Sequence, residues 1–253
     1  FKQKTAYEIM PSLVGSEMCI RDSLQGWGRA AVEVLKRLGV TVLIPKDQVC
    51  CGMPMIYSGQ LGVVEGLKER LVKHNIQVFE ALGVERVIVL CPACSNALKK
   101  YYPLLGEELM GRKPAFKALE FTEYLTQSFD IEEILKGQVN VRVTYHDPCH
   151  LRRLQGIYRE PRRILEKIPG LELVEMEEPN LCCGAGGGVK EAYPQLASKI
   201  VKRKVEMIRD IDAERVVTEC PSCYLQLARG LSQAKLRRVR VETIPEIMLK
   251  AVK

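Results

Sequence analysis

Two cysteine motifs each occur twice in this 253-residue chain, and this repetition constrains its fold more than any other feature. Cys50-Cys51-Gly52 recurs as Cys182-Cys183-Gly184. Cys91-Pro-Ala-Cys94 recurs as Cys220-Pro-Ser-Cys223 at nearly the same spacing. The chain is therefore expected to contain two copies of one structural unit.

The same order of strands and helices surrounds the motifs in both copies. A β-branched run precedes each CxxC motif (residues 86–90 and 215–218), and a helical pattern follows it. Before each Cys-Cys-Gly turn come a helix, a glycine and a strand (residues 30–44 and 162–174). This alternation predicts an α/β protein with two pseudo-repeated domains and largely parallel sheets.

A polar stretch at residues 129–138 marks the boundary between the copies, because the strand Val139–Tyr145 follows it. We therefore assign residues 24–130 to the first domain and 131–253 to the second. Long helices are expected after both Cys-Cys-Gly turns, at residues 61–82 and 191–208. A surface excursion is expected at 102–114, and a capping box at Thr243 and Glu246.

Residues 1–23 lack a clean apolar period and resemble a translated sequencing adapter. Residues 2–9 match the flow-cell end of a common short-read adapter, and residues 13–22 match the transposon end in the same frame. We interpret this segment as non-native and exclude it from fold reasoning; the alternative is a natural, poorly patterned N-terminus. The interpretation makes Cys19 an artefact, and it leaves open the length and content of the native N-terminus.

Composition indicates an ordinary globular protein, with 47% hydrophobic and 27% charged residues. The net charge of +7 is mild, and no basic block interleaved with aromatic residues indicates nucleic-acid binding. No apolar run approaches the roughly 18–20 residues that a membrane-spanning helix requires.

The clustered cysteines point to metal chemistry. All four motifs fall at strand ends or glycine-bounded turns, which an α/β sheet presents along one edge. Scattered structural cysteines would not repeat beside glycine and proline turns, and a dithiol–disulfide enzyme would leave most of them unused. Zinc at one or both sites remains an alternative, although adjacent cysteines do not easily share one tetrahedron. Iron–sulfur ligation uses many thiolates and is favoured.

Three longer segments resemble the CCG, or cysteine-rich, domain family of iron–sulfur oxidoreductases. They are residues 45–54 (PKDQVCCGMP), 145–151 (YHDPCHL) and 181–188 (LCCGAGGG). The family includes B-type and D-type heterodisulfide reductase subunits, the glycolate oxidase and anaerobic glycerol-3-phosphate dehydrogenase iron–sulfur subunits, and the lactate-utilisation A protein. The likeness covers nearly all of residues 24–253.

The resemblance implies one or two [4Fe–4S] clusters of a noncubane type. The second site would use five cysteines: Cys149, Cys182, Cys183, Cys220 and Cys223. Only four match in the first site: Cys50, Cys51, Cys91 and Cys94. Its leading ligand would fall near Cys19, whose surroundings share nothing with those of Cys149. Whether the first site holds a cluster or zinc stays open.

Four further residues are candidates for contacts to the second site. His146 and His150 flank Cys149 and could donate hydrogen bonds to cluster sulfur, or could be ordinary loop histidines. Gly184 and Gly186 would let backbone amides approach sulfur or substrate. No catalytic residue beyond the cysteines is identified.

The implied function is that of an electron-transferring oxidoreductase subunit in anaerobic metabolism. Electrons would pass to or from a disulfide, or between a flavin dehydrogenase partner (2-hydroxy acid or glycerol-3-phosphate type) and quinone. The expected partners are that flavin subunit and a ferredoxin-type iron–sulfur domain. A zinc-binding assembly module without redox activity is the alternative. Reduced cysteines favour a cytoplasmic location, with a peripheral membrane partner left open.

Overall fold

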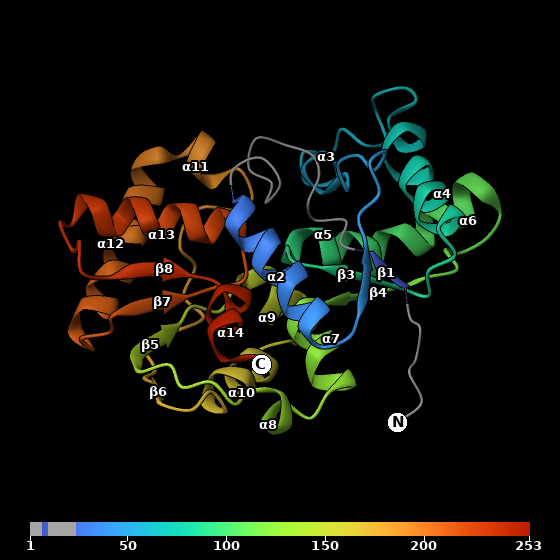
Figure 1. The fold of residues 1–253 in the computed structure, drawn as a ribbon. Coiled ribbons are helices and arrows are strands. Elements are labelled where there is room, and N and C mark those ends of the chain that lie inside the picture. Colours follow the sequence, from blue (N-terminus) through green and yellow to red (C-terminus); the bar gives the residue numbers. More distant parts are fainter. Residues whose placement is uncertain (1–6, 10–23) are drawn as a thin grey trace. The chain divides into compact units, whose positions relative to one another are not determined.

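The computed structural model describes residues 7–9 and 24–253 (Figure 1), without the side chains of 7–9. The chain divides into two compact units, Phe1–Tyr124 and Leu125–Lys253. Each unit contains one four-stranded sheet in which all neighbouring strands are parallel. The predicted class, two repeated α/β domains with parallel sheets, is confirmed. The unit boundary falls inside helix α7 (Phe121–Ser128), close to the predicted domain boundary at residue 130.

The sheet of the first unit has the order β2-β1-β3-β4. Its strands are β1 (Tyr7–Ile9), β2 (Thr41–Leu43), β3 (Arg86–Val89) and β4 (Lys117–Glu120). Helical segments separate the strands, as a parallel sheet requires. They are α2 (Gln25–Arg37), α3 (Met53–Tyr57), η2 (Glu69–Lys73), α4 (His74–Ala81), α5 (Pro92–Asn96), η3 (Ala97–Tyr101) and α6 (Tyr102–Met110).

The sheet of the second unit repeats this topology with the order β6-β5-β7-β8. Its strands are β5 (Val141–Tyr145), β6 (Leu171–Leu173), β7 (Arg215–Val217) and β8 (Arg240–Glu242). The helices are α8 (Ile131–Ile134), α9 (Cys149–Gln155), α10 (Arg159–Glu166), α11 (Val189–Ala192), α12 (Pro194–Asp210), α13 (Pro221–Gln233) and α14 (Ile244–Ala251).

Corresponding helices bury corresponding apolar faces. In the first unit, Ile76 and Phe79 of α4 belong to one core cluster with Val87 of β3. In the second, Val201 and Val205 of α12 belong to one core cluster with β7. Fully burying each such side chain contributes about 1.5–3 kcal/mol. The amphipathic helices therefore fix the sheets that carry the cysteine motifs.

Strand β1 lies between β2 and β3, as β5 lies between β6 and β7. Its pairing uses main-chain hydrogen bonds, which any non-proline segment can make. The pairing of β1 therefore does not distinguish a native segment from a non-native one. The interpretation of residues 1–23 as adapter-like stays a prediction. Cys19 lies outside the described residues.

Three predicted elements differ from the structure. The helix expected at 61–82 begins later, because Gly66 adopts a positive φ of 66° that a helix does not allow. Its first part, Glu69–Lys73, is π-helical. The helix expected at 191–208 is interrupted at Tyr193, just before Pro194. The segment 102–114, expected as a surface excursion, is largely the helix α6. Proline is compatible with the first turn of a helix, because the backbone N–H that it lacks would have no partner in the helix there.

The predicted capping box at the start of α14 is confirmed. The Glu246 carboxylate accepts hydrogen bonds from the Thr243 backbone N–H at 2.9 Å and from its hydroxyl at 2.8 Å. The first unit has the equivalent backbone contact, from the Glu120 N–H to the Glu123 carboxylate at 3.0 Å. Across residues 7–9 and 24–253, no helix combines the length and apolar character needed to cross a bilayer.

Candidate metal centre

The cysteine motifs follow the carboxyl ends of parallel strands, as predicted. Cys149 begins α9 after β5, and Cys220 is the N-cap of α13 after β7. In the first unit, Cys91 is the N-cap of α5 after β3. Because the strands of each sheet are parallel, these segments emerge at one sheet edge in each unit.

The two Cys-Cys-Gly turns approach the same edges through a left-handed glycine. Gly52 has φ 80° and caps α3, and Gly184 has φ 81°. A side chain is strained in this backbone conformation, which explains a glycine after each cysteine pair. At Gly184 an added Cβ would also lie 3.0 Å from the Ala197 carbonyl oxygen.

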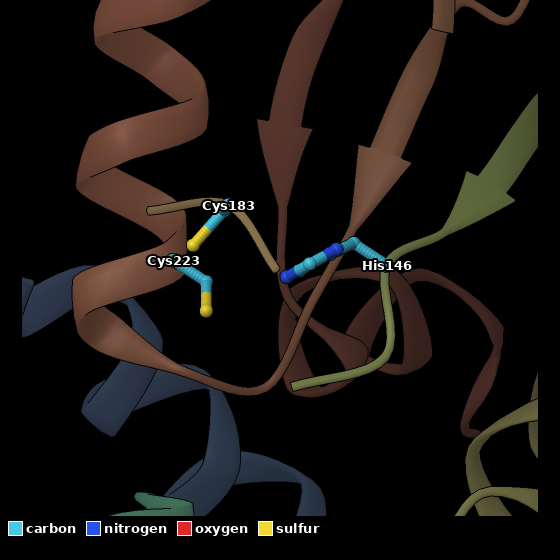
Figure 2. Close-up of side chains that lie close together, drawn as sticks. All are labelled: His146, Cys183 and Cys223. Carbon is cyan, nitrogen blue, oxygen red and sulfur yellow. The ribbon is translucent and has the colours of Figure 1, made fainter. Parts of the chain in front are cut away.

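The donor atoms of His146, Cys183 and Cys223 lie within 4.8 Å of one another in the second unit. Figure 2 shows the three side chains, which come from separate segments and converge. All three residues are buried, with exposed fractions of 1–5%. Two thiols and one imidazole are ligand types that soft and borderline metals prefer.

The other predicted cysteines of the second unit belong to the same group. Hydrogen bonds from the Cys182 and Cys223 thiols lower the pKa of Cys183 well below its usual value. Hydrogen bonds with Cys183 and Cys220 raise the pKa of Cys223. Burial, with Cys220 and Cys183 nearby, raises the pKa of Cys149. These mutual effects place near one another the five cysteines that the family resemblance implies for this site, and their role as ligands stays a prediction.

The four described cysteines of the first unit form a matching group. Hydrogen bonds from Cys50 and Cys94 lower the pKa of Cys51 well below its usual value. Hydrogen bonds with Cys51 and Cys91 raise the pKa of Cys94. The second member of each Cys-Cys pair is thus the favoured thiolate in both units.

None of the nine cysteines among the described residues forms a disulfide. Close thiols in a buried site leave charge and lone pairs that require a partner, and a thiophilic metal group meets that requirement. The donor set fits an iron–sulfur cluster, whose iron atoms are held by several thiolates. A thiolate–imidazole zinc site uses the same ligand types.

His146 is the least satisfied polar residue beside the cysteines. It is 1% exposed, and by distance and angle neither ring nitrogen makes a hydrogen bond within residues 24–253. The Cys183 thiol is a polar neighbour within 4.8 Å, and the imidazole helps to lower the pKa of that thiol. His150 differs, because its Nδ1 lies 3.5 Å from the Cys149 Sγ and burial lowers its pKa. An unpaired buried imidazole costs free energy unless a further group occupies the site, so His146 supports the presence of such a group.

The surroundings of the two predicted glycines differ. The Gly184 backbone N–H donates to the Cys182 Sγ at 3.2 Å, so an amide does approach a cysteine sulfur there. At Gly186 an added Cβ would come no closer than 3.9 Å to His150, an ordinary contact. Steric crowding thus restricts Gly184 and leaves Gly186 room for a side chain.

Among the charged residues around the second site, the sequence drew attention to Arg152 through its place beside Cys149 but did not identify Asp147, Arg162 or Lys204. Asp147 is 1% exposed, and its carboxylate forms salt bridges with the guanidinium groups of Arg152 (N···O 2.5 Å) and Arg162 (N···O 2.8 Å). Lys204 is fully buried on α12. The sequence does contain an indication that Lys204 is buried, because it falls with Val201 and Ile208 on the apolar stripe of that helix.

The model of the cysteine-rich domain family named CCG matches residues 18–99 and 143–228. A fumarate reductase (CoM/CoB) subunit from Methanothermobacter marburgensis is 45% identical, over 87% of this chain and 42% of the relative. A dihydromethanophenazine:CoB–CoM heterodisulfide reductase subunit from Methanosarcina acetivorans is 36% identical, over 88% and 54%. The chain thus spans about half the length of these relatives.

A third relative has nearly the same extent as this chain. Lactate utilization protein A from Anoxybacillus flavithermus is 30% identical, over 87% of this chain and 91% of its own length. Among solved structures, a hypothetical protein from Helicobacter pylori has the same fold, with a TM-score of 0.64, 12% identity, and coverage of 98% of this chain and 50% of its own. The two family matches coincide with the two cysteine groups, and the chain belongs to the CCG cysteine-rich domain family.

Proposed function

We propose that this chain is an iron–sulfur oxidoreductase subunit with a noncubane [4Fe–4S] cluster in its second unit. The ligands would be the five grouped cysteines, Cys149, Cys182, Cys183, Cys220 and Cys223. The first unit would hold a second cluster, or a zinc ion, through Cys50, Cys51, Cys91 and Cys94. The relatives are subunits of oxidoreductases, which supports this class of function.

One observation carries the proposal: Cys183 and Cys223 converge with the buried His146, and the pKa values of Cys149, Cys182, Cys183 and Cys223 are shifted by one another and by Cys220. Five thiols exceed the four that a tetrahedral zinc ion accepts. A cluster of several iron atoms uses the additional ligand. When bound, it supplies a group that accepts and releases single electrons.

The chain's own residues would hold and tune this group. The Gly184 amide already donates to the Cys182 sulfur, and hydrogen bonds to cysteine sulfur stabilise negative charge on it. His146 is placed to donate a further hydrogen bond or to act as a ligand. Burial of Cys183, Cys220 and Cys223 would keep water away from most of the group.

The reaction we favour is the interconversion of a disulfide and two thiols. A disulfide takes up two electrons and two protons, its S–S bond breaks, and two thiols form. The heterodisulfide reductase relative and the CoM/CoB fumarate reductase relative support this choice by their names. The electrons would come from, or go to, a flavin-containing subunit and a ferredoxin-type domain.

A second candidate is an electron relay between a flavin dehydrogenase of the 2-hydroxy acid or glycerol-3-phosphate type and quinone. The lactate utilization relative supports it, because this chain covers 91% of that protein. Both candidates use the same cysteine sites and a cytoplasmic setting. They differ in the terminal acceptor.

Anaerobic purification, followed by measurement of iron, acid-labile sulfide and zinc, tests the proposal. We expect a brown protein with iron and sulfide in comparable amounts. A colourless protein that carries stoichiometric zinc and no sulfide would instead identify a zinc-binding assembly module.

The acceptor is tested by adding reduced viologen dye to the loaded protein with either a disulfide or a quinone analogue. Oxidation of the dye by the disulfide, with two thiols formed per disulfide, supports the favoured reaction. Oxidation by the quinone alone supports the relay.

A further inference from the structure

Lys204 occupies an unusual place beside the second cysteine group. Its side chain is fully buried on α12, and its ammonium donates hydrogen bonds to the backbone carbonyls of Glu178 and Pro179. These carbonyls lie in the segment that leads into Cys182 and Cys183. The Pro179 carbonyl also accepts from the Asp147 backbone N–H at 3.0 Å, so Lys204 links the two segments that carry cysteines.

Within residues 24–253, no carboxylate forms a salt bridge with Lys204. The neighbouring Glu178 carboxylate is paired with Arg203. The Asp147 carboxylate is paired with Arg152 and Arg162. A buried ammonium without an anionic partner is costly, because it has lost its hydration and gained only neutral carbonyls.

The cysteine group is the anion available to this lysine. Burial lowers the pKa of Lys204 to about 8. Neighbouring negative groups partly offset this lowering, and the Cys183 thiolate contributes most, followed by Asp147, Glu178 and Cys223. Geometry places Lys204 at the site, because the Pro179 carbonyl that accepts from its ammonium also accepts from the Asp147 N–H, next to His146 of the His146–Cys183–Cys223 group. The two backbone carbonyls position the ammonium and cannot neutralise it.

The first unit holds its cysteine turn with different side chains, and the buried one among them is neutral. Asn75 lies on α4, the helix that follows the first Cys-Cys-Gly turn, as α12 follows the second. Its amide donates to the carbonyls of Val49 and Cys50, both at 3.1 Å, and accepts from the Val49 N–H at 2.9 Å. On the same stretch of helix, the partly exposed His74 has its Nε2 2.6 Å from the carbonyl oxygen of Asp47, which lies three residues before its cysteine pair as Pro179 does. The fully buried side chain that holds the cysteine turn is thus an amide in the first unit and an ammonium in the second.

We infer that Lys204 is a positioning residue whose buried ammonium compensates the negative charge of the second site and makes that site easier to reduce. The inference rests on the proposed function. Reduction adds one electron, taken from an external reductant such as dithionite, to a group already surrounded by thiolates. A nearby positive charge in a poorly solvated site stabilises the reduced form.

The test is a redox titration of the full-length, cluster-loaded chain, followed by electron paramagnetic resonance. The second-site signal is identified as the one lost in C182S/C183S. In Lys204→Met and Lys204→Gln we expect the one-electron equilibrium of that signal to shift at least tenfold toward the oxidised form, which is about 59 mV. The control is Lys202→Met, because Lys202 is exposed on the same helix and should leave the signal unchanged.

Two variants separate charge from hydrogen bonding. Glutamine can still donate to the Glu178 and Pro179 carbonyls, so a shift with methionine but not with glutamine would overturn the charge argument. An unchanged potential in both variants, with the cluster retained, would overturn the inference and leave the proposed function intact. Absence of any cluster in the unsubstituted chain would overturn the proposed function and this inference with it.

Discussion

The two units share strand order, cysteine motifs and the left-handed glycine after the cysteine pair, yet they surround their thiols differently. The second unit places buried charges beside its cysteines, namely Asp147 with its arginines and Lys204. At its cysteine turn the first unit uses the buried Asn75 amide, which also donates to the Tyr102 hydroxyl at 3.0 Å, and the partly exposed His74 imidazole. A duplicated scaffold can therefore keep the ligand positions while the charge around them changes.

The largest difference between the two sites should appear in metal content when one cysteine pair is removed. In C182S/C183S we expect loss of the iron, sulfide and visible absorption that belong to the second unit, because two of its five ligands and the favoured thiolate disappear. C50S/C51S is the matched variant and should remove the first-site metal alone. Metal analysis of both variants checks this; equal loss from each would show that the sites do not load independently.

The buried carboxylate in the second unit should be the next most sensitive position. Asp147→Asn leaves Arg162 with a weaker partner in a buried site, and breaking such a pair costs about 3–5 kcal/mol. Urea unfolding of the metal-free protein, followed by circular dichroism, measures this loss. Trp27, the one tryptophan, lies in the first unit, so its fluorescence transition is the internal control and should not move.

The two left-handed glycines should differ in how much a methyl group costs. Both alanine variants lose roughly 1–2 kcal/mol to the strained backbone conformation. In Gly184→Ala the new Cβ also lies 3.0 Å from the Ala197 carbonyl oxygen, whereas in Gly52→Ala the closest atom is a leucine methyl at 3.7 Å. We expect Gly184→Ala to lose about 1–3 kcal/mol more in urea unfolding; equal losses would mean that helix α12 moves aside freely.

A pH difference between the units is the smallest of these effects. The pKa of Lys204 is about 8 in the folded chain against 10.5 ordinarily, so between these values the unfolded chain binds more protons. Its destabilising contribution is complete below pH 8 and is lost as the pH rises. Relative to Lys204→Met, the metal-free protein should gain up to about 1.4 kcal/mol per pH unit in this window.

Unfolding at several pH values checks this slope. Asn75 does not titrate, and Asn75→Ala should therefore leave the slope unchanged while lowering stability. A slope that persists in Lys204→Met would assign the proton uptake to other groups, such as the cysteine thiols.

The order of strands and helices around the motifs and the cysteines of each site could be predicted from the sequence, because both depend on local signals. β-Branched runs before Cys91 and Cys220, and glycines after Cys51 and Cys183, predict strands and turns without knowledge of the rest of the chain. The pairing of Asp147 with Arg162 joins residues on different elements, and no local pattern marks such a contact. The delayed helix after Leu61 was missed because Gly62 and Gly66 were outweighed by the apolar spacing around them.

The order of the motifs along the chain also bears on biosynthesis. Among the five cysteines of the second site, Cys149 emerges from the ribosome first and Cys223 last, near the start of helix α13. Whatever metal group these residues receive, insertion into the second site must wait until this helix has been made. The first site is complete as far as Cys94 before the second begins, so maturation factors meet the two sites at different times.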